Sequence, residues 1–365
     1  MQQCKRRKRC PFCGGLNTRR HGYFPLKEGN RKNRRRWYCL ACQRCFILRR
    51  QRLAKKATHL YYDNGDTYRT VSKEIGLSLP TTYYKIKELS LRCKDPHEVS
   101  AELKPIWSGY LMLDGDALFV RGNRENLLLS MDVGTQDVPA AILAKTEDHE
   151  TWEILLNLLK DKTCYPFKGI VSDGDPSIRA ATDKLIPSIP HQLCLRHYHN
   201  FLCYRIRYQL IQVKGKWHSY QKFLNDAKHM LYANSEREVK EALDYIIRNR
   251  EFRMLRLGDI IEKMLLDFPM LTAHFRYPGL PRTSSSIEGL ISRLDAKINL
   301  ADGYWHHETA WATLKMLILR YRFKKFTDSR FKERNGKCPL ELAGVDTLKI
   351  DWIKFSQRDL KTTIS

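Results

Sequence analysis

The succession of apolar segments between residues 109 and 187 constrains the fold more than any other feature. Three short apolar runs come first, separated by turn residues: GYLMLDGDALFV, NLLLSMDVGT and PAAILAKTE. DHETWEILLNLLKDK then places apolar residues at helical spacing, FKGIVSDGD returns to a strand-like run, and DPSIRAATDKLIP is again helical. Three strands followed by a helix, a strand and a helix predict an α/β fold, with a mixed sheet and helices packed on it.

Two aspartates in these strand-like runs are candidates for a functional role. Asp114 lies inside the first run, where a buried carboxylate without a partner is costly, and Asp173 ends the run after the first helix. Strand pairing could bring the two together, and carboxylates that close repel each other unless a cation lies between them. The alternative is simple turn chemistry, because Asp-Gly in SDGD is a turn signal in its own right. The residues alone leave both readings open.

The first 50 residues contain two cysteine pairs, Cys10-x2-Cys13 and Cys39-x2-Cys42, separated by 25 residues. Pairs of this spacing are typical of one tetrahedral zinc site, and an arginine-rich segment with few aliphatic residues needs such a centre to fold. We therefore expect one structural Zn²⁺ ion. Cys4 belongs to neither pair. Cys45 forms a second possible pair with Cys42, so the identity of the fourth ligand is ambiguous. Eleven cysteines without a secretory segment favour metal binding or reduced thiols over disulfides.

The positive charge of the chain is concentrated near its start. Residues 1–56 hold 19 lysines and arginines and one acidic residue, Glu28, while the whole chain has a net charge of +25. This concentration is typical of a nucleic-acid binder, and a solubilising or membrane-surface segment is the alternative. No apolar stretch is long enough to span a bilayer. We expect a cytoplasmic, nucleoid-associated protein with no membrane partner.

The segment TYRTVSKEIGLSLPTTYYKIKEL, residues 67–89, predicts two short helices around a turn. Val71 and Ile75 would form the inner face of the first helix, which Gly76 would end, and Ser78 would precede the second. This arrangement is typical of a DNA-binding helix-turn-helix. The residues expected to face outward toward DNA are Thr81, Thr82, Tyr84 and Lys85, with Arg34, Arg35 and Arg36 as further contacts of the basic segment.

Four motifs in order carry a family resemblance over residues 105–325: LMLDGDAL with Asp114, IVSDGDPSIRAA with Asp173, HQLCLRHYHN with Cys194-x2-His197, and RTSSSIEGLISRL with Glu288. The chain resembles the Mutator-like insertion-sequence transposases, whose catalytic core is an RNase H-like fold with a DDE triad. One departure is TSSSIEG, where asparagine is more usual among the serines. The resemblance selects Asp114 over Asp116, and Asp173 over Asp175. Asp132, on the adjacent predicted strand, is a weaker candidate for the same catalytic role.

The resemblance implies an enzyme that nicks DNA at the terminal repeats of its element and joins the freed 3′-hydroxyl to target DNA. Asp114, Asp173 and Glu288 would hold two Mg²⁺ or Mn²⁺ ions. The partners would be double-stranded DNA and a second copy of the chain, as a homodimer or larger assembly on DNA. The alternatives are a DNA-binding regulator that does not use its triad, and a metal-free hydrolase with paired carboxylates, such as a glycosidase.

Two site assignments leave alternatives open. Ser285-x-x-Glu288 matches a capping box, in which the glutamate would only close the start of a helix, and Asp295 would share its helical face. Cys194 and His197 form an accessory motif. A metal ion there would need more ligands, which His191 or His199 could supply.

Residues 191–268 contain no proline and only two glycines, which together with helical periodicity predicts a helical insertion. The expected division of the chain is a zinc ribbon (1–50), a helix-turn-helix region (51–100), the first part of the RNase H-like core (101–199), the insertion (200–276), the last part of the core with the glutamate helix (277–330) and a C-terminal tail (331–365).

Overall fold

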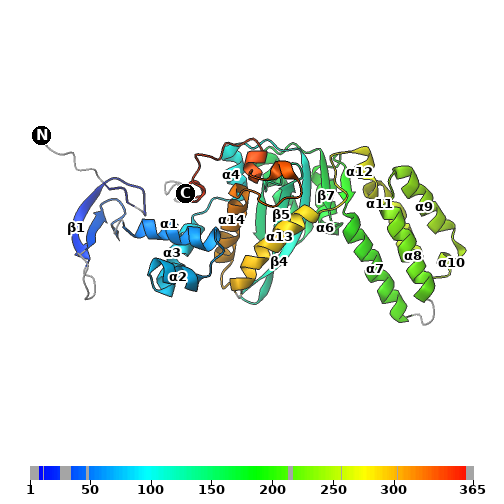
Figure 1. Cartoon of the computed structure of the whole chain (residues 1–365), viewed down its shortest axis with the longest axis horizontal. Helices are drawn as coiled ribbons and strands as arrows, with labels where there is room; N and C mark the ends of the chain where they lie inside the picture. Colours follow the sequence, from blue (N-terminus) through cyan, green and yellow to red (C-terminus); the bar gives the residue numbers. More distant parts are fainter. Residues whose placement is uncertain are drawn as a thin grey trace. The chain divides into compact units, whose positions relative to one another are not determined.

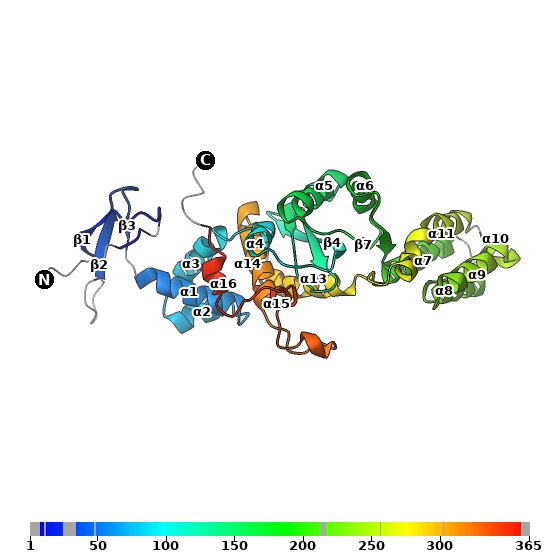
Figure 2. The ribbon, with the colours of Figure 1, turned by 90° about the horizontal axis from the view of Figure 1, so that it is seen from above.

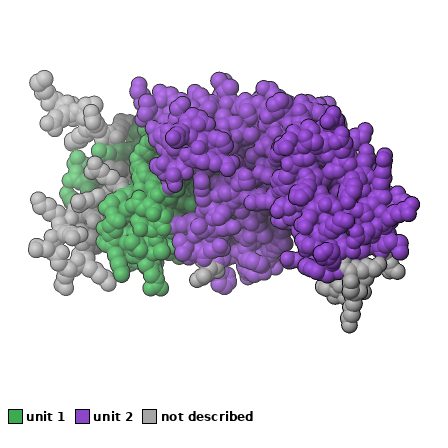
Figure 3. Space-filling model, turned by 45° about the vertical axis from the view of Figure 1, so that its right-hand side comes forward, with its two compact units in different colours: residues 1–94, 308–320, 350–365 green, residues 95–307, 321–349 purple. Residues whose placement is uncertain are grey.

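The computed structural model describes residues 8–10, 12–24, 34–46, 49–212, 217–255, 257–301 and 303–358. The chain divides into two compact units, which Figure 3 shows in different colours. The first comprises residues 1–94, 308–320 and 350–365, and the second comprises residues 95–307 and 321–349. The fold is mixed α/β, as the sequence predicts. Among the helices of the described residues, none is both long and apolar enough to cross a membrane.

A small antiparallel sheet opens the first unit, with strands β1 (Thr18–Phe24), β2 (Arg34–Cys39) and β3 (Cys45–Phe46) in that order. Cys10, Cys39 and Phe46 form its buried core, against which Trp37 packs. So small an apolar cluster cannot stabilise a sheet by burial alone, and cysteines supply most of its members.

Three helices follow: α1 (Arg49–Tyr62), α2 (Tyr68–Ile75) and α3 (Leu79–Leu91). Gly76 ends α2 in the left-handed conformation, with φ of 65°, and its N–H binds carbonyls of the last turn. Ser78 precedes α3, while Val71 and Ile86 are fully buried. The two short helices and the glycine between them are those that the sequence predicts.

One expectation about α3 is wrong. Thr82 is fully buried and its hydroxyl donates to the Ser78 carbonyl, while Lys85 is only 8% exposed, so these two side chains do not face outward. The reason is that α3 packs against both α1 and α2, and a helix with two neighbours buries more than one stripe of its surface. Tyr84 is 66% exposed and Thr81 is half-buried.

The C-terminal segment returns to the first unit. Helix α14 (His307–Phe323) contributes Arg320, which forms an ion pair with Asp63 just after α1. Helix α16 (Trp352–Phe355) leads to Ser356, whose carbonyl accepts the N–H of Lys94. Residues 350–358 therefore belong to this unit.

The second unit is built on a five-stranded sheet in the order β6-β5-β4-β7-β8. Its strands are β4 (Tyr110–Val120), β5 (Asn123–Asp132), β6 (Ala141–Ala144), β7 (Gly169–Ser172) and β8 (His191–Leu193). The β4–β5 and β5–β6 pairs are antiparallel, whereas β7 is parallel to both β4 and β8. This is the mixed sheet that the sequence predicts.

Helices cover both faces of this sheet. Figure 2 shows α5 (His149–Asn157) and α6 (Pro176–Leu185) over one face and α13 (Ser285–Ile298) over the other. Leu111, Leu113 and Ile170 point toward the first face, where they share a core with Trp152. Because alternate strand residues point to opposite faces, Asp114 lies on the side of α13, which packs against β4 and β5.

The remaining helices of this unit are α4 (Pro96–Leu103), η1 (Leu158–Lys162), α7 (Leu195–Gln212), α8 (Trp217–Leu231), α9 (Glu236–Arg248), α10 (Arg250–Arg253), α11 (Gly258–Leu271), α12 (Ala273–Arg276), η2 (Asn299–Ala301), η3 (Lys332–Arg334) and α15 (Pro339–Leu342).

Helices α7 to α12 form a bundle with an apolar core of its own (Figure 1). Gln192 of β8 joins it to the sheet, because its side chain donates to the Leu271 carbonyl and accepts from the His274 N–H. Trp217 is 61% exposed and so is not part of that core.

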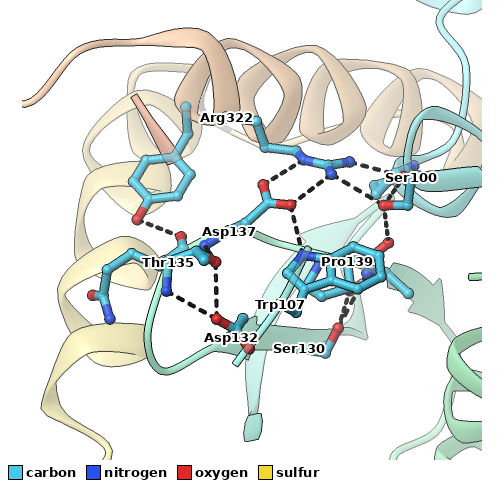
Figure 4. A network of polar contacts seen from close by, with 12 residues as sticks. Ser100, Trp107, Ser130, Asp132, Thr135, Asp137, Pro139 and Arg322 are labelled. Carbon is cyan, nitrogen blue, oxygen red and sulfur yellow. Dashed lines mark hydrogen bonds and ion pairs between the residues drawn. The ribbon is translucent and has the colours of Figure 1, made fainter. Parts of the chain in front are cut away.

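A buried polar network lies at the end of β5 and in the loop that follows it (Figure 4). The fully buried Arg322 pairs with Asp137 through two hydrogen bonds of 2.7 and 2.8 Å. Its guanidinium also donates to the Ser100 hydroxyl, and Trp107 donates to Asp137. Because every charge in this network has a partner, breaking it should cost about 3–5 kcal/mol of stability.

Candidate active site

Asp114 lies in the middle of β4, opposite Leu129 of β5, and is only 8% exposed. One carboxylate oxygen accepts the N–H of Gly115 at 3.0 Å. Burial, reinforced by the negative charge of Asp173, raises the pKa of Asp114 to about 7, while His197 opposes the shift. Asp114 is therefore a buried acid whose charge the fold alone does not balance.

Asp173 directly follows β7. The parallel register pairs Met112 of β4 with Val171 of β7, so two residues further on Asp173 is level with Asp114. Its side chain is exposed, and one oxygen accepts the N–H of Asp175. Strand pairing thus brings the two acids side by side where β7 ends, next to the middle of β4.

Asp175 has a different structural role from Asp173. Its carboxylate accepts the Ser177 N–H at 2.7 Å and caps the start of α6. Gly174 between the two acids has φ of +94°, a conformation that favours glycine. The SDGD segment therefore contains a turn and cap as well as a strand-end acid, and the two roles fall on different aspartates.

Asp132 is a structural carboxylate. Its oxygens accept from the Thr135 backbone and side chain (Figure 4). They also accept from the Ser108 backbone and side chain and from the Tyr165 hydroxyl. It is fully buried and lies opposite Leu111, three residues along β4 from Asp114. With both oxygens engaged by donors, Asp132 has no role at the candidate site.

Glu288 lies in the first turn of α13, which covers the same face of the sheet as Asp114. The residue before the helix is Ser284, and no side-chain capping bond forms there. The capping-box alternative is therefore wrong, because α13 begins one residue too early for Ser285 to be the cap. The Glu288 carboxylate instead accepts from the Ser284 hydroxyl at 3.1 Å, pairs with Arg196, and lies 3.7 Å from Nε2 of His197.

Cys194 connects the strand that leads to Asp173 with the helix that carries Glu288. Its backbone N–H donates to the Ser172 carbonyl at 2.7 Å, and its sulfur accepts the Ser284 N–H at 3.4 Å. Burial would raise the pKa of the Cys194 thiol, but hydrogen bonds from His197 and Ser284 outweigh it and lower the pKa to about 6. The bond to Cys194 is the main cause of the raised pKa of His197.

Cys194, His197 and Glu288 form a compact group, in which the potential ligand atoms all lie within 4.8 Å of one another. The two histidines expected as further ligands are engaged elsewhere. His191 Nε2 shares a 2.8 Å hydrogen bond with the Ser172 hydroxyl, and His199 Nε2 lies 3.9 Å from the Cys203 sulfur.

Three more acids lie around this site. Asp116 and Asp295 form a hydrogen-bonded pair; burial, then Asp295, raises the pKa of Asp116 to about 6. The side chain of Glu147 lies so close to Gly115 that a β-carbon there would be 2.1 Å from one of its oxygens. Burial, then Asp175 and Asp173, raises the pKa of Glu147. No sequence pattern marks Glu147, because it stands in the turn before α5 and reaches the site only through tertiary folding.

The four N-terminal cysteines also meet. The Cys10 sulfur lies 3.6 Å from that of Cys42, and the Cys13 sulfur lies 3.4 Å from that of Cys39. All four sulfurs are within 4.8 Å of one another, which fits a zinc ribbon. Cys45 is not a member of this group, and Cys4 lies outside the described residues.

The predicted arginine contacts lie on β2. Arg35 is exposed and donates to the Tyr23 hydroxyl at 2.9 Å, and Arg36 is half-buried. The side chain of Arg34 lies outside the described residues.

Comparison with known proteins identifies the family. The model of the Mutator family of transposases matches residues 102–299, which is more than half of the chain. No curated protein matches. A chain in a cryoEM structure of a simian T-cell lymphotropic virus intasome, in complex with PP2A regulatory subunit B56 gamma, is 12% identical over 49% of this chain and 69% of that one. Its TM-score is 0.21, too low to inform on the fold. The family match is sufficient by itself: the chain belongs to the Mutator family of transposases.

Proposed function

We propose that this chain is a DDE transposase, which cleaves DNA at the terminal repeats of its element and transfers the freed 3′-hydroxyl to target DNA. The observation that carries the proposal is the meeting of a buried acid, Asp114, with Asp173 at the end of the neighbouring strand. Glu288 is on the helix that packs on the same face, 3.7 Å from Nε2 of His197. The charges of both aspartates help raise the pKa of His197. The mixed sheet with helices on both faces supports an RNase H-like core.

The donor set fits Mg²⁺ or Mn²⁺. Carboxylate oxygens are the ligands that these ions prefer. Burial and then the charge of Asp173 raise the pKa of Asp114, and a bound cation would favour its charged form. Two such ions, when bound, would activate the attacking oxygen and stabilise the leaving one. In this scheme Asp114, Asp173 and Glu288 hold and orient the ions. Asp116 and Asp295 are the alternative ligands, and the family motifs favour Asp114 and Glu288 over them.

The N-terminal segments supply DNA binding in this proposal. Cys10, Cys13, Cys39 and Cys42 hold one Zn²⁺ ion and so fix the basic sheet that carries Arg35. Helices α2 and α3 act as the helix-turn-helix, with exposed Tyr84 and half-buried Thr81 toward DNA. The division of labour follows the segments predicted from the sequence, and cleavage of two element ends implies a dimer or larger assembly on DNA.

The test is cleavage of DNA that carries the flanking ends of the protein's own gene. With Mg²⁺ or Mn²⁺ we expect nicks that map to the terminal repeats, and with Ca²⁺ alone we expect binding without nicks. Sequence-specific binding with no cleavage in any divalent metal would contradict the proposal and indicate a DNA-binding regulator. Cleavage that persists in a chelator would indicate a metal-free hydrolase.

A further inference from the structure

The group formed by Cys194, His197 and Glu288 differs chemically from the proposed catalytic site beside it. It offers one thiolate sulfur, one imidazole nitrogen and one carboxylate oxygen, all within 4.8 Å of one another. Thiolate and imidazole ligands select zinc-like ions, whereas a set of carboxylates selects magnesium. Three protein ligands with a fourth position open to water is a common arrangement of zinc in proteins.

The surroundings of the Cys194 sulfur resemble those of a cysteine in the N-terminal cluster. Cys194 accepts the Ser284 N–H at 3.4 Å, and Cys10 accepts the Phe12 N–H at the same distance. A thiolate that accepts a backbone N–H keeps lone pairs for a metal ion. On His197, Nε2 lies 3.7 Å from a carboxylate oxygen of Glu288. Both residues therefore have a donor atom to offer.

Glu288 is the ligand that this group shares with the proposed triad. In this structure its carboxylate is held by Arg196 and Ser284. The Arg196 side chain is 48% exposed, so it can move into solvent when a cation takes its place. An ion bound to Cys194 and His197 would draw the Glu288 carboxylate to their side of the site.

We propose that Cys194, His197 and Glu288 form a second metal site, which binds a thiophilic divalent ion such as Zn²⁺ and competes with Mg²⁺ for Glu288. Metal binding at this group does not depend on the proposed function. The inhibition of DNA cleavage rests on it, because it requires Glu288 to be a ligand of the catalytic ion.

The first arm of the test counts zinc ions in the full chain by native mass spectrometry after dialysis against Zn²⁺. We expect two ions per chain, one for each group of ligands. Cys194→Ser and His197→Ala should each lose one ion, and the control Cys203→Ser, on the same helix as His197, should keep both. Cobalt(II) substitution should show the corresponding loss of thiolate-to-metal absorption in Cys194→Ser. One ion in the wild-type chain, or two in both variants, would overturn the proposal.

The second arm titrates Zn²⁺ into Mg²⁺-dependent cleavage. Wild-type cleavage should fall as the second ion binds and recover with excess Mg²⁺, and His197→Ala should need at least about tenfold more Zn²⁺. Equal inhibition of both proteins would overturn the competition. If instead the wild type and Asp114→Asn cleave equally well, the proposed function fails, while the ion count still decides whether the second metal site exists.

Discussion

The cysteine cluster and the carboxylate site are built in opposite ways. The cysteine cluster draws its four ligands from two short motifs within residues 10–42, on a sheet that has almost no other core. The proposed carboxylate site would draw Asp114 from β4, Asp173 from the residue after β7 and Glu288 from α13, in a unit with a large apolar core. Metal binding should therefore decide whether the first region folds, but only relieve charge repulsion in the second.

The largest effect is expected from Asp173→Asn, which should abolish DNA cleavage because it removes a proposed metal ligand, while DNA binding and the melting temperature stay close to wild type. Nicking of end-containing DNA measures the loss. The matched control is Asp175→Asn, since asparagine still caps α6. An inactive Asp175→Asn beside an active Asp173→Asn would reverse the assignment.

Cys39→Ser should release the structural zinc and unfold the N-terminal sheet, because the sheet has little else to hold it. Specific binding to the element ends should be lost with it, while the apolar core of the second unit stays folded. Zinc content and near-ultraviolet circular dichroism report the two events. The control is Cys45→Ser, whose sulfur is outside the cluster. Full zinc retention by Cys39→Ser would contradict the assignment.

The ionisation of Asp114 should lower stability in the absence of metal. Burial and Asp173 raise its pKa from an ordinary value of 3.8 to about 7, so the folded chain holds this proton more tightly than the unfolded one. The free energy of unfolding should therefore fall as the pH rises from about 4 to about 7. Asp114→Asn should remove this loss, a gain on the order of 2–4 kcal/mol at pH 8.

Urea unfolding of wild type and Asp114→Asn over this pH range measures the difference. Added Mg²⁺ should stabilise the wild type and leave the variant nearly unchanged. An identical pH dependence of the two proteins would mean that the charges at this site are already balanced without a cation.

The smallest effect is expected from Asp175→Ala. Loss of the cap on α6 should cost about 1 kcal/mol of stability and leave the rate of cleavage unchanged. Thermal unfolding and the cleavage assay together check this. A loss of cleavage beyond what unfolding explains would extend the site to Asp175.

The sequence predicts the mixed sheet well because strand and helix periodicities are local and strong between residues 109 and 187. The same holds for the cysteine pairs, whose spacing alone anticipates their meeting. Strand alternation and parallel pairing also place Asp114 beside Asp173, since β7 follows a crossover helix and lies next to β4.

What the sequence could not supply depends on packing between distant segments. The prediction that Thr82 and Lys85 face outward is wrong because α3 packs against α1 as well as α2, and no helix is predicted over residues 49–62. The engagement of Glu288 by Arg196 joins helices far apart in the chain. Glu147 comes close to Gly115 without belonging to any motif.

The most direct test of the central claim is the rate of Mg²⁺-dependent cleavage by Glu288→Gln, measured beside Asp295→Asn on DNA with the element ends. Glutamine keeps the size and polarity of the side chain, so the fold and its melting temperature should hardly change. If Glu288 completes the triad, Glu288→Gln loses cleavage and Asp295→Asn retains it. Cleavage at the wild-type rate by Glu288→Gln would contradict the account and move the third ligand to Asp295.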